Sequence, residues 1–359
     1  MSDTLGVFET PSLEATRERM RAQLSELLPA FEIDMKAEFA HEINRLKKEM
    51  NAVILGHNYM EPALYCSVPD YTGDSLELAR ISSQTEADII VFCGVQFMAE
   101  TAKILNPEKT VLIPSDKAGC SLAEAVTAED VRQLKAQYPG VPVVSYVNTY
   151  ADVKAESDYC CTSGNADKVV RHLMEQGHNR VIFLPDEYLA KNTAAEVGIE
   201  FLFPSKPGAN TAQDPPNMTR AMIGWRGRCE VHDKFQVEDI ERVRKQFPDV
   251  AVVAHPECSP EIVALSDYTG STKQMIEYVR RVDAPRYLLL TECSMGDNIA
   301  AENPQKEMLR LCSVRCPHMN QITLEDTLEG LRNIRHQVTL SDDIIKRARS
   351  PIDRMLEIV

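Results

Sequence analysis

Apolar and polar positions follow one pattern three times along the chain. Each repeat starts with a short apolar run, continues with a turn rich in Ser and Thr, and then shows the apolar spacing of an amphipathic helix. Short apolar runs without alternation are typical of strands buried on both faces of a parallel sheet. We therefore predict that the first strand of each repeat covers residues 52–57, 141–146 and 250–255.

Later positions of the repeats correspond as well. A second apolar run predicts a second strand at residues 88–92, 180–184 and 286–290. A second helix follows, then a cysteine, and then a closing helix with acidic residues in its first turn. The cysteines are Cys120, Cys229 and Cys316, and the closing helices begin near Ala128, Val237 and Leu324.

This alternation of strands and helices predicts the fold class α/β. We expect three pseudo-repeated, three-layer α/β/α domains with parallel sheets, arranged around a pseudo-threefold axis. A helical pattern over Leu13–Leu28 stands outside the repeat, so residues 1–35 are predicted to form an N-terminal helical extension. The predicted domains then cover residues 36–140, 141–248 and 249–359, the third with a C-terminal helix.

The charge of the chain argues against two classes of partner. Its 39 Lys and Arg against 54 Asp and Glu give a net charge of -15, which repels nucleic acid and anionic lipid. The apolar runs are far shorter than the roughly 20 residues that span a bilayer. The acidic N-terminus has no signal-peptide pattern. We therefore expect a cytoplasmic protein with neither nucleic acid nor a membrane as partner.

Metal binding explains the three repeated cysteines better than disulfide bonds do. Disulfides are rare in a reducing cytoplasm, whereas thiolate ligands are common there. Three cysteines at matching positions after parallel strands should converge on one site, one ligand short of a closed tetrahedral zinc site. A [4Fe–4S] cluster held in this way leaves one iron free as a Lewis acid, and zinc completed by water or His232 is the rival. Cys93 lies inside an apolar run and is expected in the core instead.

Polar residues follow the first strand of each repeat at a spacing of two, which places both side chains on the same side. A Ser or Thr then opens the next helix, where free N–H groups and the helix dipole attract anions. Any one of these residues alone is more often a helix cap or a packing residue. Their threefold recurrence favours a site for a small polyanionic substrate, built from His57, Tyr59, Ser75, Tyr146, Asn148, Ser163, His255, Glu257 and Thr272.

Several of these motifs together resemble those of the quinolinate synthase family. The shared segments keep their order and spacing over about residues 36–359, and the combination is far more specific than any one motif. They are Gly-His-Asn-Tyr at 56–59, Gly-Asp-Ser-Leu-Glu-Leu-Ala at 73–79, Gly-Val-Gln-Phe-Met-Ala-Glu at 94–100, His-Pro-Glu at 255–257, Gly-Ser-Thr at 270–272 and Cys-Pro-His-Met at 316–319.

The resemblance implies a reaction and a cofactor. Iminoaspartate condenses with dihydroxyacetone phosphate, with loss of phosphate and two waters, to give quinolinate for NAD biosynthesis. It also implies a [4Fe–4S] cluster on Cys120, Cys229 and Cys316, whose free iron would act as a Lewis acid. An L-aspartate oxidase or dehydrogenase is a candidate partner as the source of iminoaspartate.

By the same resemblance, iminoaspartate would be held by the residues at the strand ends and helix starts. His57, Tyr59 and Glu257 are then the candidates for proton transfer. Some family members carry further cysteines before the proline that follows the third ligand, and here Cys312 and Cys316 occur. Cys316 is the predicted ligand because it precedes Pro317. The residues expected to bind substrate are His57, Ser75, Tyr146, Asn148, Ser163, His255, Glu257 and Thr272.

Two other functions share some of these features. A hydro-lyase of another kind could use the same cluster and anion sites, but it would not need the combination of His57, Tyr146 and His255. An iron or redox sensor would need the cluster but not Glu257. A dinucleotide-dependent oxidoreductase is excluded, because neither a Gly-x-Gly-x-x-Gly turn nor a Walker loop follows any predicted strand.

Overall fold

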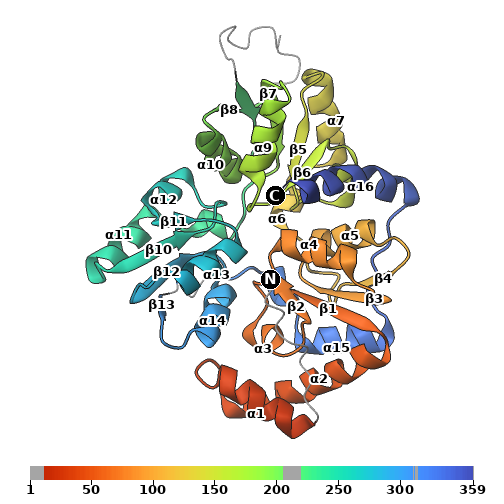
Figure 1. Ribbon diagram of the computed structural model, residues 1–359, viewed down its shortest axis with the longest axis vertical. Helices are drawn as coiled ribbons and strands as arrows, with labels where there is room; N and C mark the ends of the chain where they lie inside the picture. The colour runs from red at the N-terminus through yellow and green to blue at the C-terminus, as the bar shows by residue number, and fades with distance from the viewer. Residues whose placement is uncertain (1–11, 205–219, 310, 312–313, 359) are drawn as a thin grey trace.

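The computed structural model describes residues 12–204, 220–309, 311 and 314–358, and it contains three parallel sheets flanked by helices (Figure 1). This confirms the predicted α/β class with three similar sheets. The first sheet has the order β2-β1-β3-β4 and the third has the corresponding order β11-β10-β12-β13. The second has the order β6-β5-β7-β9-β8 and so carries one additional edge strand.

The two strands predicted for each repeat begin and end close to their predicted positions, and further strands complete each sheet. In the first sheet they are β1 (Ala52–His57), β2 (Tyr71–Gly73), β3 (Ile89–Cys93) and β4 (Thr110–Leu112). In the second they are β5 (Val143–Tyr146), β6 (Tyr159–Cys161), β7 (Arg180–Leu184), β8 (Glu200–Leu202) and β9 (Ala221–Ile223). In the third they are β10 (Val250–Ala254), β11 (Tyr268–Thr269), β12 (Arg286–Leu290) and β13 (Glu307–Leu309).

Helices cover the sheets on both sides. Those with a partner in each repeat are α4 (Ser75–Gln84), α9 (Ala166–Glu175) and α13 (Thr272–Arg281); α5 (Gln96–Leu105), α10 (Glu187–Val197) and α14 (Cys293–Glu302); and α7 (Ala128–Gln137), α11 (Val237–Gln246) and α15 (Leu324–Asn333). Shorter helices are α3 (Pro62–Tyr65), α6 (Ser121–Glu124), α8 (Ala151–Ala155) and α12 (Pro260–Leu265). The terminal helices are α1 (Leu13–Leu24), α2 (Ala30–Glu49) and α16 (Asp342–Glu357).

Each closing helix packs on the sheet that follows it in the chain. Val131 and Leu134 of α7 share a core with strands of the second sheet, and Ile240 of α11 shares one with the third. The last of the set, α15, returns to the first sheet, where it packs against β3 and α2. The three sheets are thus connected in a cycle, and the first is covered by the two ends of the chain.

An aspartate directly before the short edge strand of each sheet connects that strand to the first strand and to the helix before it. Asp70, Asp158 and Asp267 each accept a hydrogen bond from the backbone N–H of the first strand, at 2.8 Å in all three sheets. Each aspartate also pairs with a cation on the helix that precedes the first strand of its sheet. The pairs are Lys47–Asp70 at 2.8 Å, Lys135–Asp158 at 3.8 Å and Arg244–Asp267 at 3.1 Å.

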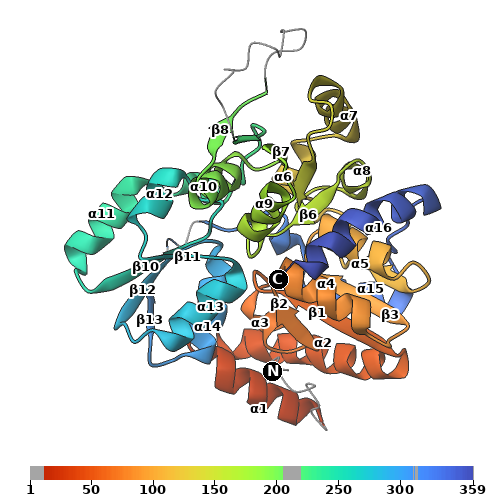
Figure 2. The same cartoon turned by 45° about the horizontal axis from the view of Figure 1, so that its top comes forward.

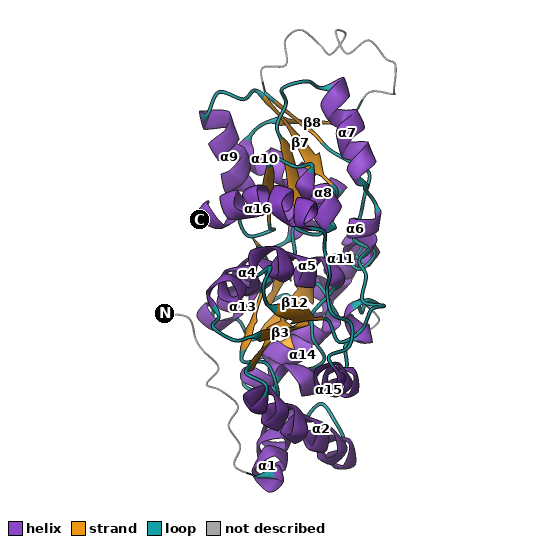
Figure 3. Ribbon diagram, turned by 90° about the vertical axis from the view of Figure 1, so that its right-hand side faces the viewer, coloured by secondary structure: helices purple, strands orange, loops and turns teal. Residues whose placement is uncertain are grey.

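The N-terminal helices and α16 close the outside of the molecule. Met20 and Leu24 of α1 are buried with Ile33 and Ala37 of α2, at the end of the molecule opposite the second sheet (Figure 3). Because α2 continues to Glu49, the predicted extension boundary at residue 35 falls inside a helix. Helix α16 lies against α8, β6 and α5, and so joins the second repeat to the first (Figure 2). No helix in the described ranges is long and apolar enough to cross a membrane.

Candidate active site

A central cavity lies where the carboxyl ends of the three sheets face one another. In each sheet the strand order reverses beside the first strand, and such reversals are where open parallel sheets bind ligands. The cavity is lined from all three repeats, and every predicted site residue lines it: His57, Tyr59, Ser75, Cys120, Tyr146, Asn148, Ser163, Cys229, His255, Glu257, Thr272 and Cys316.

Exposure separates the three predicted ligands from the remaining cysteines that the structure describes. Cys120, Cys229 and Cys316 are partly exposed to the cavity. The others are buried in cores, including Cys93, as expected for small apolar residues. Cys312, the alternative third ligand, lies outside the described residues.

The surroundings of the three thiols suit a metal. Burial raises the pKa of Cys120 to about 12 and that of Cys316 to about 11, so that thiolates here need a cation to be stable. Cys229 and Cys316 are each followed by a single helical turn, at His232–Lys234 and Met319–Gln321. Thiol donors from three separate repeats on one cavity fit a cluster with three cysteine ligands.

Glu257 lies at the centre of the polar residues. Its Oε1 accepts a hydrogen bond from the Tyr146 hydroxyl at 2.6 Å and a longer one from Asn148 at 3.5 Å. Its Oε2 lies 2.7 Å from His232 Nδ1 and 3.8 Å from His255 Nδ1. The carboxylate therefore joins groups from the second and third repeats.

Burial and neighbouring groups set the protonation of this cluster. Burial alone would raise the pKa of Glu257, but His232, His255 and the Tyr146 hydroxyl outweigh it and lower that pKa below its ordinary value. Burial lowers the pKa of His57 to about 4 and that of His255 to about 3. At neutral pH we therefore expect an ionised Glu257 together with neutral His57 and His255.

The first and third repeats use the same backbone turn to orient a histidine. The N–H of Tyr59 donates to His57 Nδ1 at 3.2 Å, and the N–H of Glu257 donates to His255 Nδ1 at 3.4 Å. Because Nδ1 accepts in both cases, a neutral ring carries its proton on Nε2. Each histidine can thus donate to a ligand from that atom.

Thr291, directly after β12, was not predicted, and it contacts two residues that line the cavity. Its Oγ1 lies 2.5 Å from the Tyr59 hydroxyl and 3.1 Å from His232 Nε2. The signal for it in the sequence is a polar residue directly after the second predicted strand of the repeat, at residues 286–290. Thr291 connects the first repeat to the turn that carries Cys229.

The helix starts at the cavity are capped differently in the three repeats. Asp74 caps α4 and also accepts a hydrogen bond from Ser271 at 2.9 Å, while Ser271 caps α13. Ser75 and Thr272 are the first residues of these helices, and Thr272 accepts a hydrogen bond from Asn58 at 2.8 Å. Ser163 precedes α9, whose own cap residue, Asn165, makes no side-chain hydrogen bond to the helix.

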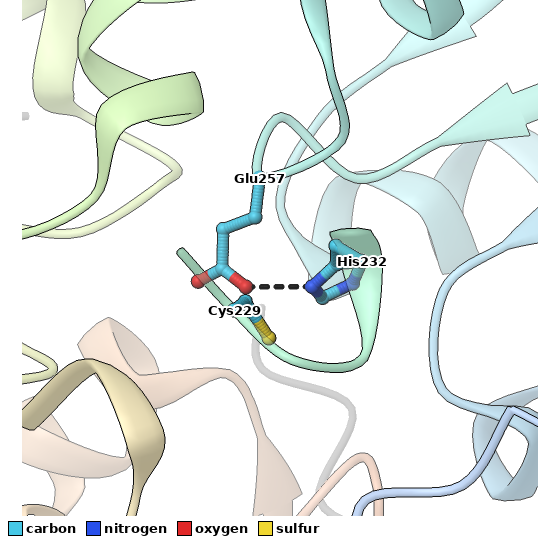
Figure 4. Close-up of side chains that lie close together, drawn as sticks. All are labelled: Cys229, His232 and Glu257. Atoms are coloured by element: carbon cyan, nitrogen blue, oxygen red, sulfur yellow. Dashed lines mark ion pairs between the residues drawn. The ribbon is translucent and has the colours of Figure 1, made fainter. Parts of the chain in front are cut away.

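Three side chains in the cavity meet the spacing of a compact metal site. Within the part of the chain that the structure describes, the ligand atoms of Cys229, His232 and Glu257 lie within 4.8 Å of one another. Figure 4 shows the three side chains converging, with the His232 ring and the Glu257 carboxylate in contact.

Comparison with known proteins now decides the family. The sequence profile of the family described as Quinolinate synthetase A protein matches residues 41–357. The chain belongs to this family. Quinolinate synthase 2 of Mesorhizobium japonicum is 51% identical over 330 residues, which make up 92% of this chain and 93% of the relative. The quinolinate synthase of Agrobacterium fabrum is 51% identical over 88% of this chain and 84% of its own, and that of Xylella fastidiosa is 48% identical over 91% and 88%.

These relatives confirm the predicted membership of the quinolinate synthase family and, with it, the prediction of an enzyme of NAD biosynthesis. The cavity of this chain also contains a group of side chains that could bind a metal, Cys229, His232 and Glu257. The roles predicted for individual residues remain predictions, which the arrangement in the cavity now makes specific.

Proposed function

We propose that the chain condenses iminoaspartate with dihydroxyacetone phosphate to form quinolinate, releasing phosphate and two waters, and that Cys120, Cys229 and Cys316 hold a [4Fe–4S] cluster for this reaction. The observation that carries the proposal is the convergence of these three partly exposed thiols and the Glu257 cluster on one cavity. When bound, such a cluster supplies a Lewis-acidic iron that polarises a hydroxyl or carboxylate oxygen.

The protein groups around the cavity supply binding and proton transfer. In our proposal, the hydroxyls of Ser75, Ser163 and Thr272 and the free N–H groups at the starts of α4 and α13 hold the anionic groups of the substrates. Asn148 and the Nε2–H groups of His57 and His255 donate to the same anions, which orients iminoaspartate among the three repeats.

Proton transfer falls to Glu257 and Tyr59. Glu257 is ionised, and its Oε2 points away from the Tyr146 hydroxyl that holds Oε1, so Oε2 can accept a proton from the substrate. Burial raises the pKa of Tyr59, which therefore stays protonated and can donate to a leaving hydroxyl. His57 contacts the Tyr59 ring edge-on at 4.8 Å and keeps it in place.

Cellular context completes the proposal. We place the reaction in the cytoplasm, with small molecules as partners and with neither nucleic acid nor a membrane, as the charge of -15 favours. Iminoaspartate would come from an L-aspartate oxidase or dehydrogenase.

The deciding experiment combines metal analysis with a product assay on anaerobically purified protein. We expect about four irons and four acid-labile sulfides per chain, as a [4Fe–4S] cluster requires, and quinolinate formation from the two substrates. A cluster without turnover would favour the sensor or another hydro-lyase. Zinc in place of iron in an active enzyme would overturn the proposed cofactor.

A further inference from the structure

We propose that Cys229, His232 and Glu257 also form a mononuclear site for a divalent transition metal, with Zn²⁺ as the foremost candidate. This site shares Cys229 with the proposed cluster site but uses neither Cys120 nor Cys316. It therefore differs from a zinc site built on the three cysteines, and it forms in the chain that carries no cluster.

The first observation in support of this site is the short distance between the three ligand atoms. Cys229 Sγ, a ring nitrogen of His232 and a carboxylate oxygen of Glu257 lie within 4.8 Å of one another, and His232 Nδ1 is 2.7 Å from Glu257 Oε2. Zn²⁺ binds sulfur at about 2.3 Å and nitrogen or oxygen at about 2.0 to 2.2 Å. A metal ion can thus reach all three atoms with small side-chain adjustments (Figure 4).

The second observation is a buried nitrogen without a hydrogen bond. His232 is 1% exposed, and among the described residues none makes an aligned hydrogen bond to its Nδ1. Its contact with Glu257 is close, but it lacks the alignment of a hydrogen bond. Since a buried polar atom without a partner is costly, this nitrogen is suited to a ligand that approaches along its lone pair.

Contacts with neighbouring residues hold His232 and Glu257 in orientations that suit metal binding, as is usual for metal ligands. Thr291 Oγ1 lies 3.1 Å from His232 Nε2, so Nε2 can donate to this hydroxyl while Nδ1 binds the metal. The Tyr146 hydroxyl donates to Glu257 Oε1 at 2.6 Å, which leaves Oε2 on the side of His232. Both ligands are therefore fixed by groups that do not belong to the site.

The donor set also indicates the kind of metal. One thiolate, one imidazole and one carboxylate are ligands that Zn²⁺ accepts in tetrahedral sites, with the fourth position open here to the cavity. Because Cys229 cannot serve both sites, a zinc ion at this position excludes cluster ligation. We infer that zinc and the cluster compete for the chain.

The test uses full-length protein prepared without a cluster and titrated anaerobically with Co²⁺, which gives a sulfur-to-cobalt charge-transfer band when a thiolate binds. We expect one Co²⁺ per chain, displaced by one Zn²⁺. His232→Gln should lose this band yet still take up iron and sulfide on reconstitution. Cys120→Ala and Cys316→Ala should keep the band and lose the iron.

Thr291→Val provides a milder variant if His232→Gln does not fold. It leaves His232 in place without its outer contact, and we expect the metal affinity to fall about 10- to 100-fold. A band that survives in His232→Gln but vanishes in Cys120→Ala would overturn the proposal in favour of a three-cysteine zinc site. Failure of cluster reconstitution in the unmodified chain, with cobalt binding intact, would contradict the proposed cofactor and leave this site supported.

Discussion

Glu257 shows how one residue can depend on several repeats at once. Tyr146 fixes one of its oxygens from the second repeat, and His232 and His255 approach the other. A charged carboxylate with 3% exposure is stable only because these polar groups replace water. Its geometry is thus a product of the assembled cavity rather than of its own loop.

Replacing this charge tests the proposed proton transfer. Glu257→Gln keeps the shape and the acceptor for Tyr146 but removes the base, so kcat should fall by about 10²- to 10⁴-fold. Iron content should be unchanged. The matched control is Glu261→Gln on α12, an exposed glutamate that should leave kcat as it was. Full activity in Glu257→Gln would remove Glu257 from the mechanism.

The cysteines allow a second test with internal controls. Cys120→Ala, Cys229→Ala and Cys316→Ala should each abolish both cluster and quinolinate formation, because each removes a proposed ligand. Cys93→Ala and Cys66→Ala remove buried side chains that do not line the cavity, so they should retain both, at a stability cost of about 1 kcal/mol. A fully active Cys316→Ala would instead point to Cys312.

At the scale of elements, two strands of each repeat could be predicted because continuous apolar runs are typical of strands buried in a parallel sheet. The strands β7 and β12 begin and end at the predicted residues. The short edge strands β2, β6 and β11 could not be predicted, since they have two or three residues each and coincide with the predicted turns. These edge strands form because they pair with the longer first strand, and their own short sequences do not indicate this pairing.

The site was predictable to the same extent and for a related reason. Residues that recur at the same place in each repeat, such as His57 and His255, show in the sequence. The contact of Thr291 with Tyr59 joins residues 232 positions apart, and nothing local indicates it. The packing of His232 against His255, stacked at 4.7 Å, has the same origin in tertiary structure.

The aspartates that pair with a helix cation predict that the same substitution lowers stability by different amounts in two repeats. Asp70→Asn keeps the acceptor for the backbone but leaves Lys47, which is 2% exposed, without its counter-charge, at a cost of about 3 kcal/mol or more. Asp267→Asn is the matched control, because Arg244 is 37% exposed and can be solvated, so the cost should stay below about 1 kcal/mol. Urea unfolding measures both, and equal effects would contradict this account.

At the scale of the whole molecule, the repeats are joined by helices that pack on the sheet of another repeat. The predicted domain boundaries at residues 140 and 248 remain a prediction, and the packing of α7 and α11 on the following sheets favours boundaries placed before these helices. Sequence similarity locates the closing helices in the repeat, but it does not say which sheet they cover.

An ionic contact between three helical segments predicts a pH dependence of stability. Glu156 accepts hydrogen bonds from Arg132 on α7 at 2.9 Å and from Arg347 on α16 at 2.6 Å. Burial acts to raise the pKa of Glu156, but the two arginines lower it by more. The pKa of Glu156 therefore lies below its ordinary value. A lowered folded-state pKa gives stability that is present above the unfolded pKa of about 4.3 and is lost as the pH falls through the folded value.

The expected result is a difference that depends on pH. Glu156→Gln should lower stability at pH 7 by about 1 to 2 kcal/mol, and its deficit should shrink once the pH drops below about 4. Thermal unfolding of both proteins over this range measures it. Glu238→Gln, at an exposed position of α11, serves as control and should show no such trend. A constant deficit at all pH values would mean that charge is not the cause.

The return of α15 to the first sheet has a consequence for the order of synthesis. Thr327 of this helix lies 3.8 Å from Cys93 of β3, and Val338 donates a backbone hydrogen bond to Val111 of β4 at 2.8 Å. The ribosome makes β3 and β4 long before it makes these partners. The first sheet therefore keeps an apolar face open until residues 324–338 emerge, and that face needs protection from aggregation while the second and third repeats are being made.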